Sequence, residues 1–361
     1  MAPRVESPVR FGVLSFAMYH ANFWSLAIAD SDLTEFMGIW DDNPERGQCA
    51  AKEYGTEYWS NLDSLLDVCD AVAITSETLN HVELAERAAA KGCHMLLEKP
   101  LATTMEGCDR IEAAVRQAGV LFMQSFPKRF DPVNQELKNL VDNGELGRIT
   151  LMRVRHGHLY GLVGDTAHSS WMGDPLLAGG GSLLDEGIHG ADLIRWMFGE
   201  PEAVMATISY PTGREVEDLG VAIFTFEGGL ICELAASSTF AAADNSVEIY
   251  GTKGTAVLSG VDLASRDLTG HSYLKVCRLS EDNRQDITTR KWMISDLVPR
   301  FKKTPIFHQQ NPIQFIEALV QGHQPPTTIE DGRLSLQMIL SAYESARHGR
   351  MVKIPNSVVL E

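Results

Sequence analysis

The sequence lacks the features that would place the chain in a membrane or an oxidising compartment. None of its six cysteines forms a CxxC pair, which favours buried or idle thiols in a reducing environment. No apolar run approaches the roughly 20 residues that a membrane helix needs. The first ten residues contain no apolar core of a signal peptide. We therefore expect a cytoplasmic protein.

Positive charge is also scarce in this chain. The 31 lysines and arginines are outnumbered by 48 acidic residues, which gives a net charge of −17. A negative field of this size repels phosphate backbones and anionic lipids, so neither nucleic acid nor a membrane is expected as a partner. An anionic cofactor can still bind through a local set of N–H donors. The 361 residues are enough for two domains.

Short apolar runs alternate with helical patterns through the first 125 residues. Strands alternating with helices predict right-handed βαβ units and a parallel sheet. We expect a Rossmann-type, doubly wound α/β domain over residues 1–130. The predicted strands are 11–15, 36–40, 71–75, 94–97 and 120–124, and the predicted helices are 18–29, 44–54, 81–91 and 105–118.

The pattern changes after Phe130. Most of the later strands alternate apolar and polar residues, as an antiparallel sheet covered on one face does. We expect an α+β domain with one large, mostly antiparallel sheet over residues 131–361, and we interpret 280–307 as a loop or an arm. The predicted strands are 149–156, 203–209, 221–226, 230–235, 246–250, 255–258 and 273–278, and the helices are 132–143, 184–198, 312–321 and 332–346.

The glycines of a dinucleotide fingerprint are missing from the first strand-to-helix turn. The pattern GxGxxG would place them at Ser15, Ala17 and His20. Ser15 and Ala17 are small enough for a backbone to approach a phosphate, whereas His20 keeps the helix away from the sheet. The turn is therefore either a cofactor site built without glycine or a degenerate turn without a ligand.

The second predicted strand ends in an acidic residue, Asp41. It lies at the distance from the turn that is typical of the acid that binds the adenine ribose. The alternative is that Asp41 or Asn43 caps the helix that begins at Pro44. No arginine stands directly beside Asp41, since Arg46 is one helical turn on, and this favours NAD over NADP.

Several later segments resemble, in order, one family of oxidoreductases. The most specific are the Glu-Lys-Pro triplet at Lys99 and the run Gly-Gly-Gly-Ser-Leu-Leu-Asp-Glu-Gly-Ile-His that ends at His189. The chain resembles the glucose–fructose oxidoreductase/inositol dehydrogenase/rhizopine catabolism (Gfo/Idh/MocA) family over nearly its whole length. The other matching segments are 70–75 with His81, 129–132, 330–332 and 343–346.

This resemblance implies a nicotinamide cofactor, a sugar, cyclitol or related polyol as substrate, and a homodimer or homotetramer. It implies that Lys99, Asp185 and His189 carry the chemistry. It also places further residues beside the cofactor, namely Thr75, His81, Glu98 and Lys99 itself.

These residue types suit the oxidation of a secondary alcohol. His189 can accept a proton near neutral pH. Asp185 precedes it by four residues, which on a helix places both side chains on one face. Lys99 follows a predicted parallel strand, at the edge where ligands bind, and its ammonium can stabilise a developing alkoxide. A cis bond between Lys99 and Pro100 is compatible with this position.

Each of the three residues also has an ordinary structural explanation. Asp185 fits a capping box with Ser182, His189 could be a core or surface histidine, and Lys99 could be solvated. Their joint occurrence in the family order favours function. His156 and Trp171, with His158 and His168, are candidates for the substrate pocket. The spacing of the three histidines matches no common zinc pattern, and we expect no metal.

Three functions fit these observations. The first is a dehydrogenase of a sugar, cyclitol or related polyol. The second is an enzyme that oxidises its substrate transiently, for example to cleave a glycosidic bond, and recycles its NAD. The third is a non-catalytic binding or regulatory protein that has lost its cofactor. The missing glycines favour the third, and the set of Lys99, Asp185 and His189 favours the first two.

Overall fold

The computed structural model describes residues 4–164, 170–240, 245–260, 273–280, 287–293 and 306–355. The chain divides into two compact units. The first comprises Met1–Pro127, Asp165–Gly180 and Ile306–Leu336, and the second comprises Lys128–Gly164, Gly181–Pro305 and Gln337–Glu361. Two later segments thus return to the first unit. The simple division into domains 1–130 and 131–361 stays a prediction.

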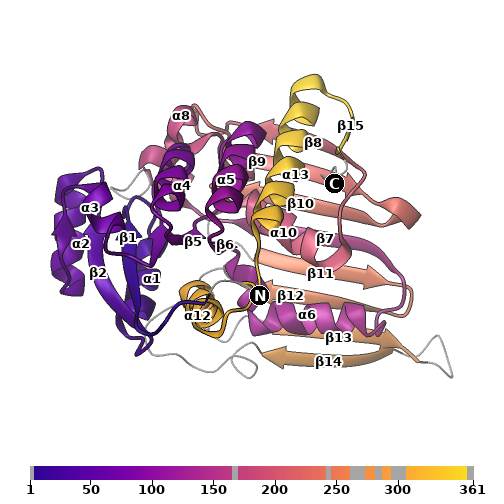
Figure 1. Ribbon diagram of the computed structural model, residues 1–361. Helices are drawn as coiled ribbons and strands as arrows, with labels where there is room; N and C mark the ends of the chain where they lie inside the picture. Colours follow the sequence, from indigo (N-terminus) through magenta and orange to yellow (C-terminus); the bar gives the residue numbers. More distant parts are fainter. Residues whose placement is uncertain are drawn as a thin grey trace. The chain divides into compact units, whose positions relative to one another are not determined.

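The first unit contains a six-stranded parallel sheet in the order β3-β2-β1-β4-β5-β6. This confirms the predicted Rossmann-type domain. Figure 1 labels β2, β1, β5 and β6 of this sheet. The short strand β3 was not predicted, because two residues carry no periodicity. The strands are β1 Val9–Leu14, β2 Thr34–Trp40, β3 Tyr58–Trp59, β4 Ala71–Ile74, β5 His94–Leu97 and β6 Phe122–Gln124.

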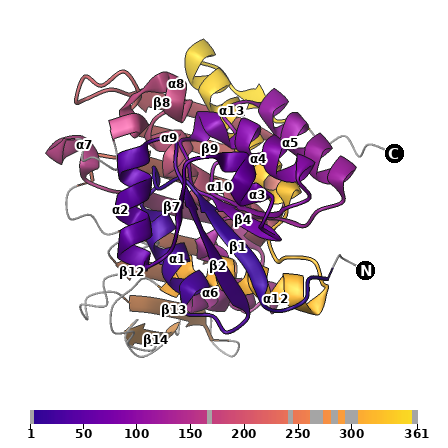
Figure 2. The ribbon, with the colours of Figure 1, turned by 60° about the vertical axis from the view of Figure 1, so that its left-hand side comes forward.

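Helices cover both faces of this sheet, because right-handed connections run in opposite directions from its centre. Helix α1 packs beside α12, and α4 packs beside α5. Figure 2 brings α1, α2 and strands β1 and β2 forward. The helices are α1 His20–Ala29, α2 Pro44–Tyr54, α3 Leu62–Leu66, α4 His81–Ala90, α5 Met105–Ala118, α8 Pro175–Ala178 and α12 Ile306–Gln321, with 3-10 turns η1 Thr78–Asn80 and η3 Ser170–Gly173.

The second unit contains a nine-stranded sheet in the order β14-β13-β12-β11-β7-β10-β9-β8-β15. All neighbours are antiparallel except β7 and β10. This confirms the predicted α+β architecture, and β14 lies within the segment interpreted as a loop or arm. The strands are β7 Ile149–Gly157, β8 Ala203–Ser209, β9 Leu219–Thr225, β10 Ile231–Ser237, β11 Asn245–Gly251, β12 Gly254–Gly260, β13 Tyr273–Leu279, β14 Ile287–Met293 and β15 Val352–Lys353.

One face of this sheet is buried, since alternate residues along β7 and β10 point into the core. Helix α10 lies directly on that face. A Cβ added to Gly190 would sit 2.4 Å from Leu234, so glycine is what lets the helix approach β10 so closely. The helices of this unit are α6 Pro132–Asp142, α7 Tyr160–Val163, α9 Ser182–Asp185 and α10 Gly187–Phe198. Helix α13 Ile329–His348 belongs to this unit from Gln337 on. The 3-10 turns are η2 Pro127–Phe130, which belongs to this unit from Lys128 on, and η4 Glu227–Gly229.

The predicted helix over 184–198 is wrong in one respect. It is interrupted after Asp185, and α10 begins at Gly187. Glycine is a poor helix former, and the intervening Glu186 directs its carboxylate to His156 on β7. Asp185 and His189 therefore do not share one continuous helix, as the spacing argument required.

The helices and the cysteines agree with what the composition predicts. Within the described part of the chain, no helix combines the length and the apolarity needed to cross a bilayer. All six cysteines are unpaired, and four of them are buried. Burial raises the pKa of Cys93 to about 11 and that of Cys232 to about 12, so these thiols are held in the unreactive protonated form.

Candidate active site

The turn after β1 keeps the backbone shape of a glycine turn although it contains no glycine. Ser15 has a φ of +73°, in the left-handed region that glycine normally occupies. The hydroxyl of Thr75 donates to the Ser15 carbonyl oxygen at 2.6 Å, and the Ser15 amide donates to the carbonyl oxygen of Trp40 at 2.7 Å. Neighbouring strands therefore hold the strained residue in place.

The backbone amides of this turn have acceptors within the protein. Phe16 donates to the Asp41 carboxylate at 2.7 Å, Ala17 to the Ser15 hydroxyl at 3.2 Å, and Met18 to the Thr75 carbonyl oxygen at 3.0 Å. Trp171 on η3 donates its indole N–H to the Ala17 carbonyl oxygen at 3.1 Å. Trp171, predicted to line the substrate pocket, thus lies against the turn. His168 falls outside the described residues.

Asp41 is bound on both oxygens and buried. Arg46 reaches it from one turn into α2, with contacts of 2.8 to 3.1 Å, and also contacts Glu77 and the Ser15 hydroxyl. The arginine that looked one turn away in sequence is therefore beside Asp41 in space. Burial raises the pKa of the Asp41 carboxyl, although Arg46 and the bound amides oppose the shift.

Asn43 settles the question of the helix cap. Its side chain accepts from the amides of Glu45 and Arg46 at the start of α2, while Asp41 accepts from the Asn43 amide at 2.9 Å. Asn43 is the N-cap that the alternative interpretation allowed. Asp41 instead joins the end of β2 to the turn after β1.

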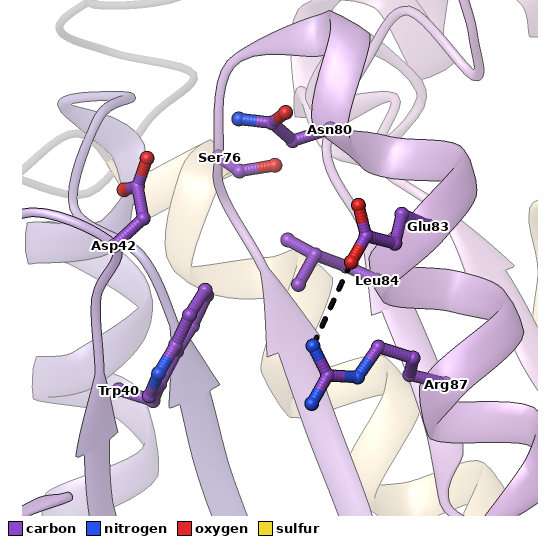
Figure 3. A pocket seen from close by; sticks show the side chains of 7 residues that line it. All are labelled: Trp40, Asp42, Ser76, Asn80, Glu83, Leu84 and Arg87. Atoms are coloured by element: carbon purple, nitrogen blue, oxygen red, sulfur yellow. Dashed lines mark ion pairs between the residues drawn. The ribbon is translucent and has the colours of Figure 1, made fainter. Parts of the chain in front are cut away.

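A pocket of about 190 Å³ opens beside the end of β2. Figure 3 shows Trp40 and Asp42 on one side and Leu84 on the other, with Ser76 between them. Unlike Asp41, Asp42 has an exposed carboxylate. The sequence pattern predicted Asp41 as the residue that binds the ribose. Only the burial of each side chain shows that Asp42, and not Asp41, is accessible to a ligand. The remaining lining residues are Asn80, Glu83 and Arg87.

His20 starts α1 and points toward the end of β5. Its Nδ1 lies 3.2 Å from Glu98, and its ring stacks on that of His308 from α12 at 3.9 Å between centroids. Burial works against a charge on Glu98, but His20 and the adjacent Lys99 together lower the pKa of its carboxyl. Glu98 is therefore a buried anion, and its contact with Nδ1 holds the His20 ring in place at the start of α1.

Lys99 lies two residues after the end of β5 and is 4% exposed. The bond from Lys99 to Pro100 is cis. His81, at the start of α4, places Nδ1 2.9 Å from the Pro100 carbonyl oxygen and Nε2 3.3 Å from that of Ser76. Burial lowers the pKa of His81, so the ring is neutral and ties the loop after β4 to the loop that carries Lys99.

The second unit gathers the other predicted catalytic residues. His189 on α10 is 3% exposed, and its ring lies edge-on to that of His156 at 5.6 Å between centroids. Asp185 is the last residue of α9, and its carboxylate accepts a hydrogen bond from the Tyr160 hydroxyl at 3.1 Å. Burial, followed by the Asp185 charge, raises the pKa of Tyr160 well above its usual value, so the phenol remains a donor. His156, predicted to contact substrate, thus adjoins His189.

Glu217 supports this arrangement, although no sequence motif marks it as a functional residue. Its carboxylate accepts from the amides of Gly181 at 2.8 Å and Leu183 at 2.9 Å, at the start of α9. The Tyr343 hydroxyl donates to it at 2.6 Å. Burial raises the pKa of the Glu217 carboxyl, although these hydrogen bonds act to lower it. The capping box with Ser182, which was the structural alternative for Asp185, is absent, because the N-cap of α9 is Gly181 and makes no side-chain hydrogen bond.

Comparison with known proteins agrees with this geometry. Residues 9–126 match the oxidoreductase family with an NAD-binding Rossmann fold, and residues 134–257 match the Gfo/Idh/MocA C-terminal domain. The chain belongs to the Gfo/Idh/MocA oxidoreductase family. The predicted family, enzyme class and NAD cofactor are thereby confirmed for this Gfo/Idh/MocA oxidoreductase.

Individual relatives cover almost the whole length of this Gfo/Idh/MocA oxidoreductase. It is 26% identical to 1,5-anhydro-D-fructose reductase of Ensifer adhaerens over 96% of this chain and 98% of the relative. It is 24% identical to scyllo-inositol 2-dehydrogenase (NAD(+)) of Bacillus subtilis (strain 168), over 97% of each. A solved aldose-aldose oxidoreductase from Caulobacter crescentus, complexed with glycerol, matches with a TM-score of 0.79 and 26% identity over 96% of this chain and 99% of that one.

Proposed function

We propose that this protein is an NAD-dependent dehydrogenase that oxidises a CH–OH group of a sugar, cyclitol or related polyol. The observation that carries the proposal is the buried His189 together with the half-buried Asp185, which accepts from the Tyr160 hydroxyl, in the segment that the family resemblance marks as catalytic. Relatives named for an anhydro sugar and an inositol support the substrate class.

The residues of the first unit fit a dinucleotide. The left-handed turn at Ser15 lets the chain approach a pyrophosphate as a glycine would, at the start of α1. The pocket offers the indole of Trp40 and the side chain of Leu84 to a base, and the exposed Asp42 carboxylate to ribose hydroxyls. We assign Asp42 to the ribose, and Ser15, Ala17 and Thr75 to the shape of the turn.

The nicotinamide cofactor, when bound, would supply the hydride acceptor for the oxidation. His189 accepts the proton of the substrate hydroxyl, a role that histidine side chains commonly fill near neutral pH. Asp185 orients the substrate or the imidazole, with the Tyr160 hydroxyl holding its carboxylate in place. The Lys99 ammonium donates to the reacting oxygen and stabilises the developing alkoxide.

A panel of polyols and sugars, incubated with NAD⁺ and followed by NADH absorbance, tests the proposal. With the substrate found, Lys99→Met and His189→Asn are expected to lower kcat by about 10²- to 10⁴-fold while NADH binding persists. Lys91→Met, at an exposed lysine of the same unit, and His323→Asn, at an exposed histidine, serve as controls. Full turnover of either catalytic variant would disprove the assigned roles.

One observation favours a non-catalytic alternative. The turn amides and Asp41 are all engaged within the protein, as in a turn that needs no ligand. Fluorescence titration with NADH and then NADPH distinguishes the two functions. If NADH binds more tightly than NADPH, the result supports the dehydrogenase. If neither nucleotide binds, the non-catalytic binding or regulatory function becomes the better explanation.

A further inference from the structure

We infer that His156, His158 and Glu186 form a binding site for a divalent transition-metal ion. The three residues come from two parts of the second unit that are distant in sequence. Their candidate ligand atoms all lie within 4.8 Å of one another. The spacing of the histidines in the sequence matches no common zinc pattern, whereas in the structure Glu186 joins His156 and His158 from a different segment.

The fold explains why the three side chains converge. His156 is on β7, and His158 follows it by two residues, so both point to the same face of the sheet. That face is the one covered by α10, where Met152 and Val154 of the same strand are buried. Glu186 occupies the interruption between α9 and α10, above this end of β7.

The distances are those of a nearly formed metal site. Oε2 of Glu186 lies 2.9 Å from Nε2 of His156, and Oε1 lies 3.6 Å from Nε2 of His158. Ligands about 2.0–2.2 Å from a tetrahedral ion are separated from one another by roughly 3.3–3.6 Å. The separation between the ligand atoms of the two imidazoles is at most 4.8 Å, so side-chain movements of up to about an ångström would let one ion contact all three residues.

The donor set indicates which ion fits. Two imidazoles and one carboxylate suit Zn²⁺, Mn²⁺, Fe²⁺ or Co²⁺ better than Ca²⁺ or Mg²⁺, which prefer oxygen. Three protein ligands leave at least one position for water or a substrate oxygen, as in catalytic rather than structural metal sites. His156 and Glu186 are buried and His158 is about one-third exposed, which leaves an approach from solvent.

The surroundings of the three ligands are specific as well. Lys128 Nζ lies 3.4 Å from Nδ1 of His156. The positive charge of the Lys128 ammonium repels a metal ion bound to His156 and so lowers the affinity of the site for the metal. Tyr160 stacks on His158, and His189 lies edge-on to His156. An ion at this place would adjoin the proposed catalytic residues. There it would bind a substrate hydroxyl, a role that rests on the proposed function.

Metal binding can be measured without substrate or cofactor. The untagged full chain is stripped with a chelator and titrated with Zn²⁺ and Mn²⁺ by calorimetry, and with Co²⁺ by its visible absorption. One equivalent is expected to bind. His158→Gln and Glu186→Gln are each expected to weaken binding at least about tenfold, since each removes one of three ligands. His323→Gln, at an exposed histidine of the first unit, is the matched control.

The outcomes separate this site from the proposed function. Circular dichroism confirms that the variants are folded, and His158→Gln changes the most exposed of the three ligands. No binding of any of the three ions, or binding that both variants leave unchanged, would overturn the inference and leave the contact as an ion pair. Failure of NADH to bind would count against the proposed function and leave the metal titration unaffected.

Discussion

Ser15 holds a left-handed backbone conformation without being a glycine. Its hydroxyl accepts from the Ala17 amide and from Arg46, so the side chain itself contributes bonds that glycine would lack. The arginine in turn neutralises the buried Asp41, which fixes the Phe16 amide. A polar network thus replaces the conformational freedom on which the usual fingerprint depends.

The backbone explanation of Ser15 predicts how substitutions rank. Ser15→Gly is expected to change the NADH dissociation constant by less than about threefold, because glycine adopts a positive φ without cost. Ser15→Val is expected to weaken binding by at least about tenfold, since a β-branched residue is a genuine outlier there. Fluorescence titration measures both. Equal affinities for the two variants would show that the conformation of residue 15 does not matter for binding.

The short helix α9 depends on residues far from it in sequence. Its N-cap, Gly181, has no side chain, and a Cβ there would lie 2.0 Å from the Glu217 carbonyl oxygen. The Glu217 carboxylate takes the place of a local cap for two amides. The position of Asp185, at the end of this helix, is therefore set by the segment before β9 and by α13.

Removing this external cap should destabilise the second unit. Glu217→Gln turns an NH₂ group toward one of the two amides and leaves it unsatisfied, at a cost of about 1–3 kcal/mol. Tyr343→Phe removes one hydrogen bond and should cost about 1 kcal/mol. Urea denaturation measures both. A Glu217→Gln variant as stable as the wild type would mean that the carboxylate is not the cap.

The large sheet has a second face that the helices α9 and α10 do not cover. Met205 and Ile223 are register partners on it, with exposures of 38% and 42%. Beside them Arg153 forms ion pairs with Glu233 and Glu248. This mixture of apolar and paired charged side chains suits an interface between copies of the chain.

We predict a homodimer or homotetramer that uses this face. Ile223→Lys places a charge among the apolar side chains of the interface and should convert the assembly to monomers, because an unpaired charge is costly to bury. Light scattering coupled to gel filtration measures the mass. Val163→Lys changes a residue that is 66% exposed on α7 and is expected to leave the mass unchanged. A monomeric wild type would contradict the prediction.

The sequence alone determined the architecture of this protein. Apolar periodicity depends on near neighbours in the chain, so it located β1, β2, β4, β5 and β6 and most strands of the second sheet. It could not locate β3 or β15, each of two residues, because their pairing depends on partners elsewhere. The motifs with Lys99 and His189 likewise indicated the family.

Tertiary structure decided what the individual side chains do. Asp41 proved buried and Asp42 exposed, because α2 folds Arg46 back onto the end of β2. Glu186 meets His156 and His158 only because α9 ends where β7 ends. Burial and long-range contacts set the charge, partner and accessibility of a group. A local sequence pattern carries no information about them, and so the sequence determined the family whereas the fold determined the site.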